Sequence, residues 1–178
     1  LRCIEMLGYV EHIPHVGAMV RTFHRQEIEE AYQVRDALET YAVLISGGGR
    51  EQLIQELEDC LVQMRKAVQT DNIRKFSRAD NQFHRLIVGY SRNETMISFW
   101  ESLKMQLHVV AAVVDTSIPL AEIYRLHPPV VNSLREMQTV DASMHLTTHY
   151  EIIKGHWKNR QGNRSSVVSK IEKNRENV

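Results

Sequence analysis

The feature that most constrains the fold is the spacing of apolar residues from Gln26 onward. In successive segments, apolar residues recur every three or four positions, which is the period of an α-helix with one buried face. Glycines, prolines and short polar stretches separate the segments, and the chain shows no internal repeat. The spacing therefore predicts an all-α fold, an antiparallel bundle of six or seven helices joined by short loops.

The limits of the expected helices follow from these interruptions. Gly47-Gly48-Gly49 ends the first helix, Asp71-Asn72 caps the third, and Pro128 suits the first turn of a later one. The expected ranges are 26–46, 50–69, 73–90, 93–114, a short helix ending near 126, one from 128, and a last one from 141 to about 159. In the helix that Asn93 begins, the expected buried stripe is Met96, Phe99, Trp100, Leu103, Leu107, Val110 and Val114.

The two ends of the chain differ from this helical part. LRCIEMLG has the pattern of the last turns of a helix closed by Gly8, and it lacks an initiator Met, so we expect a preceding part to be missing. YVEHI and AMVRTF are rich in β-branched and aromatic residues and are joined by PHVG, which predicts a β-hairpin. The tail from Gln161 is polar, and we expect it to be frayed.

Composition narrows the classes of function. The 178 residues contain 22 Lys and Arg and 22 Asp and Glu, so net charge gives no sign of a nucleic-acid or membrane partner. Cys3 and Cys60 lack CxxC spacing, which favours a reduced, cytoplasmic setting. No apolar run reaches membrane-spanning length. GxSxG, P-loop, HExxH and GxGxxG motifs are absent, and so is the paired ExxH pattern of ferritin-like proteins.

The helix around RADNQFHRLIVGY turns two polar residues toward its own apolar face. Asp80 and His84, one turn apart, fall in the stripe formed by Ile73, Phe76, Phe83, Ile87 and Val88. A buried carboxylate must be paired, hydrogen-bonded or bound to a metal. The alternative is an ordinary i,i+4 pair on a solvated face.

Other polar residues occupy apolar stripes in the same way. His145, His149 and His156 lie within or beside the apolar arc of the last helix, which together with Asp80 and His84 favours a shared ligand set. A single such histidine would more often be a hydrogen-bonded core residue. Arg35 and Glu39 lie in the stripe of the first long helix. Either they form an intrahelical pair, or the Arg35 guanidinium points into a cavity where it suits a ligand carboxylate.

Four motifs in their order and spacing resemble a known family. VRDALE, ADNQFH, SRN and the His127…His149 pair are similar to the FCD domain, the ligand-sensing C-terminal domain of the FadR-like branch of GntR-type bacterial transcription regulators. The first residues resemble the end of that family's winged-helix DNA-binding domain. The resemblance implies a winged-helix remnant over 1–23, a helical effector-binding domain over 24–160, and a polar, disordered tail over 161–178.

The resemblance also implies site residues, some of which spacing alone does not select. Metal-binding members of the family use an Asp and three His, which correspond here to Asp80, His84, His127 and His149. The implied ion is divalent, with zinc as the first expectation and nickel or manganese as alternatives. For a carboxylate effector, the matching residues are Arg35 and Asn93. The wing remnant would offer weak DNA contacts from Arg2, His12 and His15.

The resemblance implies a function as well. We expect a metabolite-responsive, cytoplasmic, homodimeric regulator that binds operator DNA through the mostly missing N-terminal domain and responds to a small organic acid. One alternative is a metal-dependent hydrolase or lyase, in which an open metal position activates water. Another is a metal-free sensor for a larger apolar ligand such as an acyl chain.

Overall fold

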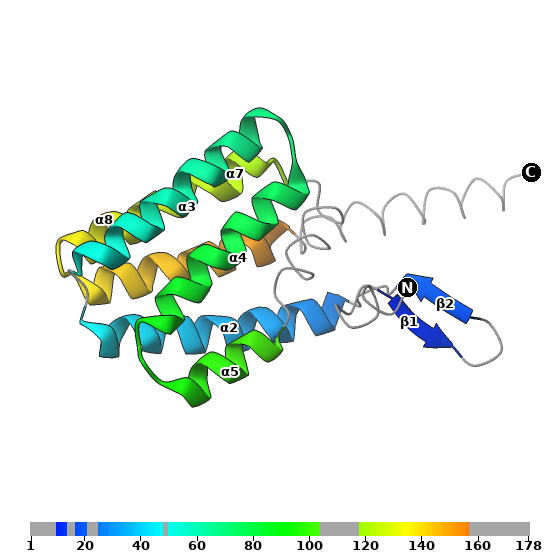
Figure 1. Ribbon diagram of the computed structural model, residues 1–178, viewed down its shortest axis with the longest axis horizontal. Helices are drawn as coiled ribbons and strands as arrows, with labels where there is room; N and C mark the ends of the chain where they lie inside the picture. The colour runs from blue at the N-terminus through cyan, green and yellow to red at the C-terminus, as the bar shows by residue number, and fades with distance from the viewer. Residues whose placement is uncertain (1–9, 14–16, 21–24, 48–49, 104–117, 157–178) are drawn as a thin grey trace, which may run out of the picture.

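Helices make up nearly all of the structure, as the apolar spacing predicts. The computed structural model describes residues 10–13, 17–20, 25–47, 50–103 and 118–156 (Figure 1). The labelled helices are α2 (Arg25–Ser46), α3 (Glu51–Gln69), α4 (Ile73–Gly89), α5 (Glu94–Ser102), α7 (Leu120–Arg125) and α8 (Pro128–Arg135). Residues 139–156 form the last helix of the described part, which begins two residues before the expected Asp141.

The predicted β-hairpin precedes the helices. β1 (Val10–Ile13) pairs antiparallel with β2 (Gly17–Val20), in a register that sets Val10 opposite Val20 and Ile13 opposite Gly17. This confirms the hairpin. The expected helix end at LRCIEMLG and the polar tail from Gln161 lie outside the described residues.

The residues expected to end and begin helices do so. Gly47 follows α2 with φ of 80°, a left-handed conformation that glycine adopts at little cost. Asn72 caps α4, because its side chain accepts a hydrogen bond from the Lys75 N–H at 2.9 Å. Asn93 caps α5 by accepting from the Met96 N–H at 3.1 Å.

The main core lies between α3, α4, α7, α8 and the last helix, with residues of α2. Its most buried members, apart from alanines, are apolar side chains with at most 1% exposure, which are Tyr32, Val43, Leu57, Met64, Phe76, Phe83, Ile87, Val130, Val131, Leu134, Leu146 and Tyr150. A tight turn at residues 70–72 lets α4 fold back along α3, and Asp71 takes a φ of 45° there. Burial of this apolar surface is the main stabilising contribution to the fold.

A smaller cluster holds α5 against α2 and α4. It comprises Ala42, Val88, Met96 and Trp100, with Leu38 and Ile97 packed beside it. The prediction that Phe99 is buried with them is wrong, since 61% of its surface is exposed. The sequence pattern had assumed one stripe from Met96 to Val114, whereas the described helix α5 turns Met96 and Trp100 inward. Leu107, Val110 and Val114 lie outside the described residues.

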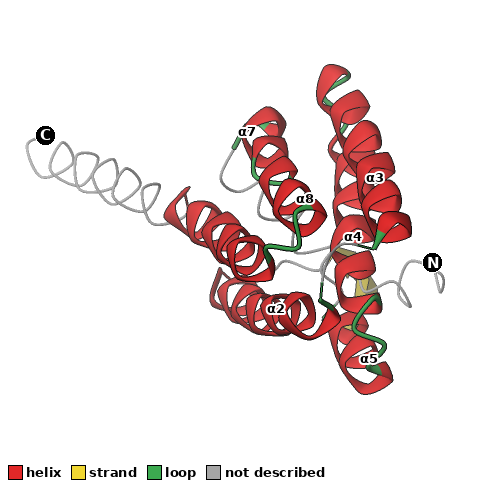
Figure 2. Ribbon diagram, turned by 90° about the vertical axis from the view of Figure 1, so that its left-hand side faces the viewer, coloured by secondary structure: helices red, strands yellow, loops and turns green. Residues whose placement is uncertain are grey.

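The last helix closes the bundle beside α2. The two lie side by side in both ribbon views (Figures 1 and 2) and are joined by a hydrogen bond from the Thr147 hydroxyl to Asp36 Oδ1 at 3.0 Å. Side chains from α2, α4, α8 and the last helix therefore meet in one interior. None of the helices within the described ranges has the length and apolar character needed to cross a membrane.

Two phenylalanines test this assignment of core and surface. Phe76 is fully buried, so Phe76→Ala should lower the free energy of unfolding by about 3–5 kcal/mol. Phe99→Ala, the same change at an exposed site of α5, should alter it by less than about 0.5 kcal/mol. Urea denaturation followed by circular dichroism measures both. A loss at Phe99 equal to that at Phe76 would contradict the described orientation of α5.

Candidate metal centre

Four side chains expected to bind a metal meet inside the bundle. Asp80 and His84 come from α4, His127 stands at the start of α8, and His149 belongs to the last helix. Each is at most 2% exposed. One ligand atom from each lies within 4.8 Å of the others. A carboxylate and three imidazoles from three separate elements thus share one point.

Local structure explains how each group reaches that point. Asp80 and His84 are four residues apart, so both project from the same face of α4. His127 is the N-cap of α8, and Pro128 and Pro129 occupy the first helical turn, where a missing backbone N–H costs nothing. The preceding helix α7 orients the His127 ring, because His127 Nδ1 donates to the Ile123 carbonyl at 3.0 Å.

The ring nitrogens reveal a shortage of donors at the centre. His127 Nδ1 faces a carbonyl, and His84 Nδ1 faces Glu39 Oε2 at 2.5 Å, so both Nδ1 atoms must carry protons. In neutral rings, this leaves both Nε2 atoms as acceptors, although they lie 3.3 Å apart. His127 Nε2 also lies 3.0 Å from Asp80 Oδ1, which is a further acceptor. A metal ion, or an additional proton on one of these groups, would satisfy the facing acceptors.

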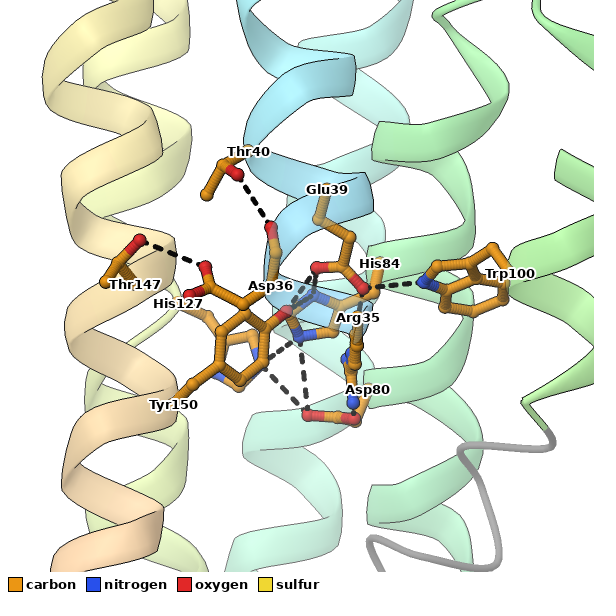
Figure 3. Close-up of polar contacts among 10 residues, drawn as sticks. All are labelled: Arg35, Asp36, Glu39, Thr40, Asp80, His84, Trp100, His127, Thr147 and Tyr150. Atoms are coloured by element: carbon orange, nitrogen blue, oxygen red, sulfur yellow. Dashed lines mark hydrogen bonds and ion pairs between the residues drawn. The ribbon is translucent and has the colours of Figure 1, made fainter. Parts of the chain in front are cut away.

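Glu39 is the second carboxylate of the site, and it receives four donors. Its oxygens accept hydrogen bonds from Arg35 Nε at 2.8 Å, from Trp100 Nε1 at 2.7 Å, from His84 Nδ1 and from the Tyr150 hydroxyl (Figure 3). Glu39 has no exposed surface. Four donors fill the acceptor sites of an ionised carboxylate, so this buried charge is fully satisfied.

Arg35 joins the two carboxylates. Besides donating to Glu39, its guanidinium places Nη2 3.6 Å from Asp80 Oδ2, an ion pair without a hydrogen bond. Within the described part of the chain, three buried polar atoms have no hydrogen-bond partner, and all belong to this centre: Arg35 Nη2, Asp80 Oδ2 and His149 Nδ1. Unpartnered buried polar atoms are rare in proteins, and their gathering at one point indicates a ligand site.

The electrostatics favour ionised carboxylates at Glu39 and Asp80 and a neutral imidazole at His149. Burial would raise the pKa of Glu39, but the charges of His84 and Arg35 and the hydrogen bonds from His84 and Tyr150 lower it to about 2. Burial opposes ionisation of Asp80 too, yet the hydrogen bond from His127 and the charges of His84 and Arg35 hold its pKa well below the usual range. Burial, then the charges of His127 and His84, lowers the pKa of His149 well below its usual value.

The other histidines of the last helix stay apart from the four ligands. His145 is half-buried and is not among the described groups that could hold a metal. His156 pairs with Glu122 on α7, with Nε2 and Oε1 2.9 Å apart. Of the three histidines on the apolar side of the last helix, His149 is the one that the structure places among the four candidate ligands.

The remaining predicted site residues lie elsewhere. Asn93 is exposed and caps α5, so the structure does not bring it together with Arg35. Arg2 and His15 lie outside the described residues. The backbone of His12 pairs with Ala18 in the hairpin, but its side chain is not among those described. The predicted DNA contacts of these three residues stay predictions.

Sequence reasoning missed the role of Glu39. It placed Glu39 in the buried stripe of α2 but offered only a pairing with Arg35, which the structure contains as one contact of four. The signal available was that Trp100 and Tyr150 also fall in buried stripes. Their N–H and O–H groups need partners when buried, and a buried carboxylate can supply both.

Comparison with known protein families identifies one matching family. The FCD domain family matches residues 30–152. A protein of Paenarthrobacter nicotinovorans named as a probable D-xylose utilization operon transcriptional repressor is 27% identical over 149 residues. That match covers 84% of this chain and 66% of the relative's length, so the chain corresponds to slightly less than two thirds of that protein.

Solved structures share the fold at low sequence identity. E. coli McbR/YncC superposes with a TM-score of 0.71 at 15% identity, covering 89% of this chain and 81% of that one. The metal-free FCD domain of TM0439 gives a TM-score of 0.60 at 17% identity, covering 76% of this chain and 94% of that one. At such identities the likeness concerns the fold, an FCD-type helical bundle.

The low pKa of Glu39 predicts a pH dependence of stability. A group whose pKa falls from 4.5 to about 2 on folding stabilises the folded state above pH 4.5, and this contribution is lost as the pH falls toward 2. Glu39→Gln lacks the titrating group. In metal-free protein, the stability advantage of the wild type over Glu39→Gln should therefore shrink between pH 5 and pH 3, as measured by urea denaturation. An advantage that is constant over this range would contradict the assignment.

Proposed function

Because the chain belongs to the FCD domain family of GntR-type regulators, we propose that its bundle is a sensor domain for a divalent metal ion and a small carboxylate. The observation that carries the proposal is the convergence of Asp80, His84, His127 and His149 on one buried point with too few donors among them. A cation bound at this point would satisfy the acceptor atoms that face one another. In the intact protein, occupancy of the site would control binding to operator DNA.

The donor set suits a divalent transition metal. Three imidazoles and one carboxylate are typical ligands of zinc and are also compatible with nickel or manganese, so zinc is the first candidate. Bound there, the ion would supply a positive charge that an acidic ligand could pair with. Metal binding requires deprotonated ligands, so the affinity for the ion should fall with falling pH.

Charge balance favours a monoanionic effector. Among the described side chains of the centre, Arg35 carries one positive charge, and Glu39 and Asp80 each carry one negative charge. A divalent ion with neutral histidines leaves one net positive charge inside the bundle. Uncompensated buried charge is costly, and a carboxylate would remove it. Arg35 Nη2, which has no hydrogen-bond partner, would donate to that carboxylate.

The domain division and the assembly belong to the same proposal. Residues 24–160 form the effector domain, and residues 1–23 are the end of a winged helix whose larger part would contact DNA. A homodimer would convert effector binding into a change in the spacing of two DNA-binding domains. Such coupling requires the effector to bind one dimer geometry more tightly than the other. The matched relative named as a repressor supports a regulator over the hydrolase or lyase alternative.

Two histidines on the same helix test the metal site. Wild-type protein should bind about one equivalent of Zn²⁺, and His149→Ala should weaken binding at least tenfold, on the order of the loss seen when supporting residues of metal sites are removed. His145→Ala, one turn away, should bind zinc as the wild type does. Isothermal titration calorimetry of chelator-treated proteins gives both affinities. Equal affinity in wild type and His149→Ala would reject the site.

Arg35 tests the carboxylate part of the proposal. With zinc bound, acetate or lactate should raise the melting temperature of the wild type, while neutral acetamide should not. Arg35→Lys keeps the positive charge but loses the planar fork of donors, so it should bind zinc yet lose most of the carboxylate-dependent rise. Differential scanning fluorimetry measures both. Equal stabilisation by acetate and acetamide would show that the site does not recognise the carboxylate charge.

A further inference from the structure

We propose that Glu39 is the positioning residue of the metal centre: it fixes His84 in the tautomer that presents Nε2 to the ion. The inference rests on the proposed metal-binding function and adds a residue outside the four ligands. His84 Nδ1 lies 2.5 Å from Glu39 Oε2, and His84 Nε2 faces the centre, 3.3 Å from His127 Nε2 and 3.8 Å from Asp80 Oδ1. The Nδ1 atom of His84 is thus directed at Glu39, and its Nε2 atom is directed at the other ligands.

The position of the Glu39 carboxylate is itself fixed by three further donors. Arg35 Nε and Trp100 Nε1 donate to Oε1, while the Tyr150 hydroxyl donates to Oε2. These donors come from α2, α5 and the last helix. Since all of them are buried and directed at one carboxylate, Glu39 has little freedom to rotate or withdraw from His84.

The consequence for His84 follows from hydrogen-bond chemistry. An ionised carboxylate only accepts, so the nitrogen facing Glu39 must carry the proton. Neutral His84 therefore keeps a lone pair on Nε2, the atom directed at the other ligands. A carboxylate behind a ligating histidine both orients the ring and increases its basicity, and loss of such a partner typically lowers metal affinity about 10–100-fold.

Replacement of Glu39 by glutamine should reverse the tautomer. The N–H groups of Arg35 and Trp100 can only donate, so the amide oxygen must take the place of Oε1. The amide NH₂ then faces His84 and Tyr150, which can both accept. His84 Nδ1 would accept from the amide and the proton would move to Nε2, the atom needed for metal binding. Glu39→Gln changes only one group, yet it should leave His84 Nε2 protonated and therefore unable to bind the metal ion.

A matched control exists on the surface of the same protein. Glu122 pairs with His156 on an adjacent helix, with both side chains partly exposed, and neither belongs to the four-ligand group. Glu122→Gln makes the identical chemical change beside a histidine. It should leave zinc affinity and the His84 tautomer unchanged.

The experiment compares wild type, Glu39→Gln and Glu122→Gln in two ways. Long-range ¹H–¹⁵N spectra of the metal-free proteins at pH 7.5 report which nitrogen of His84 is protonated, with His84→Gln used to assign its signals. Calorimetric titration with Zn²⁺ reports affinity. We expect Nδ1–H in wild type and Glu122→Gln, Nε2–H in Glu39→Gln, and an affinity loss of about 10–100-fold in Glu39→Gln only.

The two readouts separate the positioning role from a purely structural one and from the proposed function. Lower stability of Glu39→Gln with an unchanged tautomer and unchanged zinc affinity would overturn the positioning role. If wild type binds no zinc, the proposed function fails, while the tautomers of metal-free wild type and Glu39→Gln still decide the role of Glu39. Should Glu39→Gln not fold, an Nε2–H tautomer of His84 in wild type would still overturn the proposal.

Discussion

The structure depends on holding charged groups in an apolar bundle without leaving them unbalanced. Arg35, Glu39 and Asp80 are all at most 1% exposed, and a single unpaired ion at such a position would cost several kcal/mol. Charged neighbours provide the balance. Arg35 pairs with both carboxylates, His84 also contacts Glu39, and His127 also contacts Asp80. The charges are tolerated only as a set. Removing one member should affect the others, so single substitutions here should not be additive.

The same set connects several elements of the bundle through hydrogen bonds. Through Glu39, the ligand cluster reaches Trp100 of α5, a helix otherwise held by a small satellite cluster. Through His127, it reaches α7 by the Ile123 carbonyl. A ligand that redistributes charge at the centre would therefore act on hydrogen bonds to α2, α5, α7 and the last helix at once. This gives the proposed sensor a physical route from binding to helix packing, since packed helices adopt discrete arrangements rather than deforming continuously.

Much of the fold and part of the site could be predicted from the sequence, and the reasons differ by residue. Gly47, Asn72 and Asn93 mark helix boundaries through local sequence signals, and the helices end or begin there as predicted. Asp80 and His84 were recognisable because both fall in an apolar stripe of a single helix. His127 was not, because its place at the centre depends on how α7 and α8 meet, which no periodicity encodes; only the family resemblance selected it.

One error, at Phe99, and one omission, at Glu39, have a common origin. Phe99 was assigned to the core, and Glu39 was given one partner instead of four, because a helical pattern indicates which face is apolar but not which other elements cover it. Partners 45, 61 and 111 residues away complete the surroundings of Glu39. Such contacts are set by tertiary packing and become visible only when the helices are placed in space.

X-ray absorption spectroscopy of the zinc-loaded protein tests the central claim most directly. If a cation satisfies the acceptors at this buried point, the zinc should show imidazole nitrogens from three histidines and a carboxylate oxygen at about 2.0–2.2 Å, without sulfur. The imidazole contribution should fall by one in His149→Ala. A sulfur shell near 2.3 Å from cysteine, or a shell of water oxygens alone, would place the metal elsewhere and contradict the account.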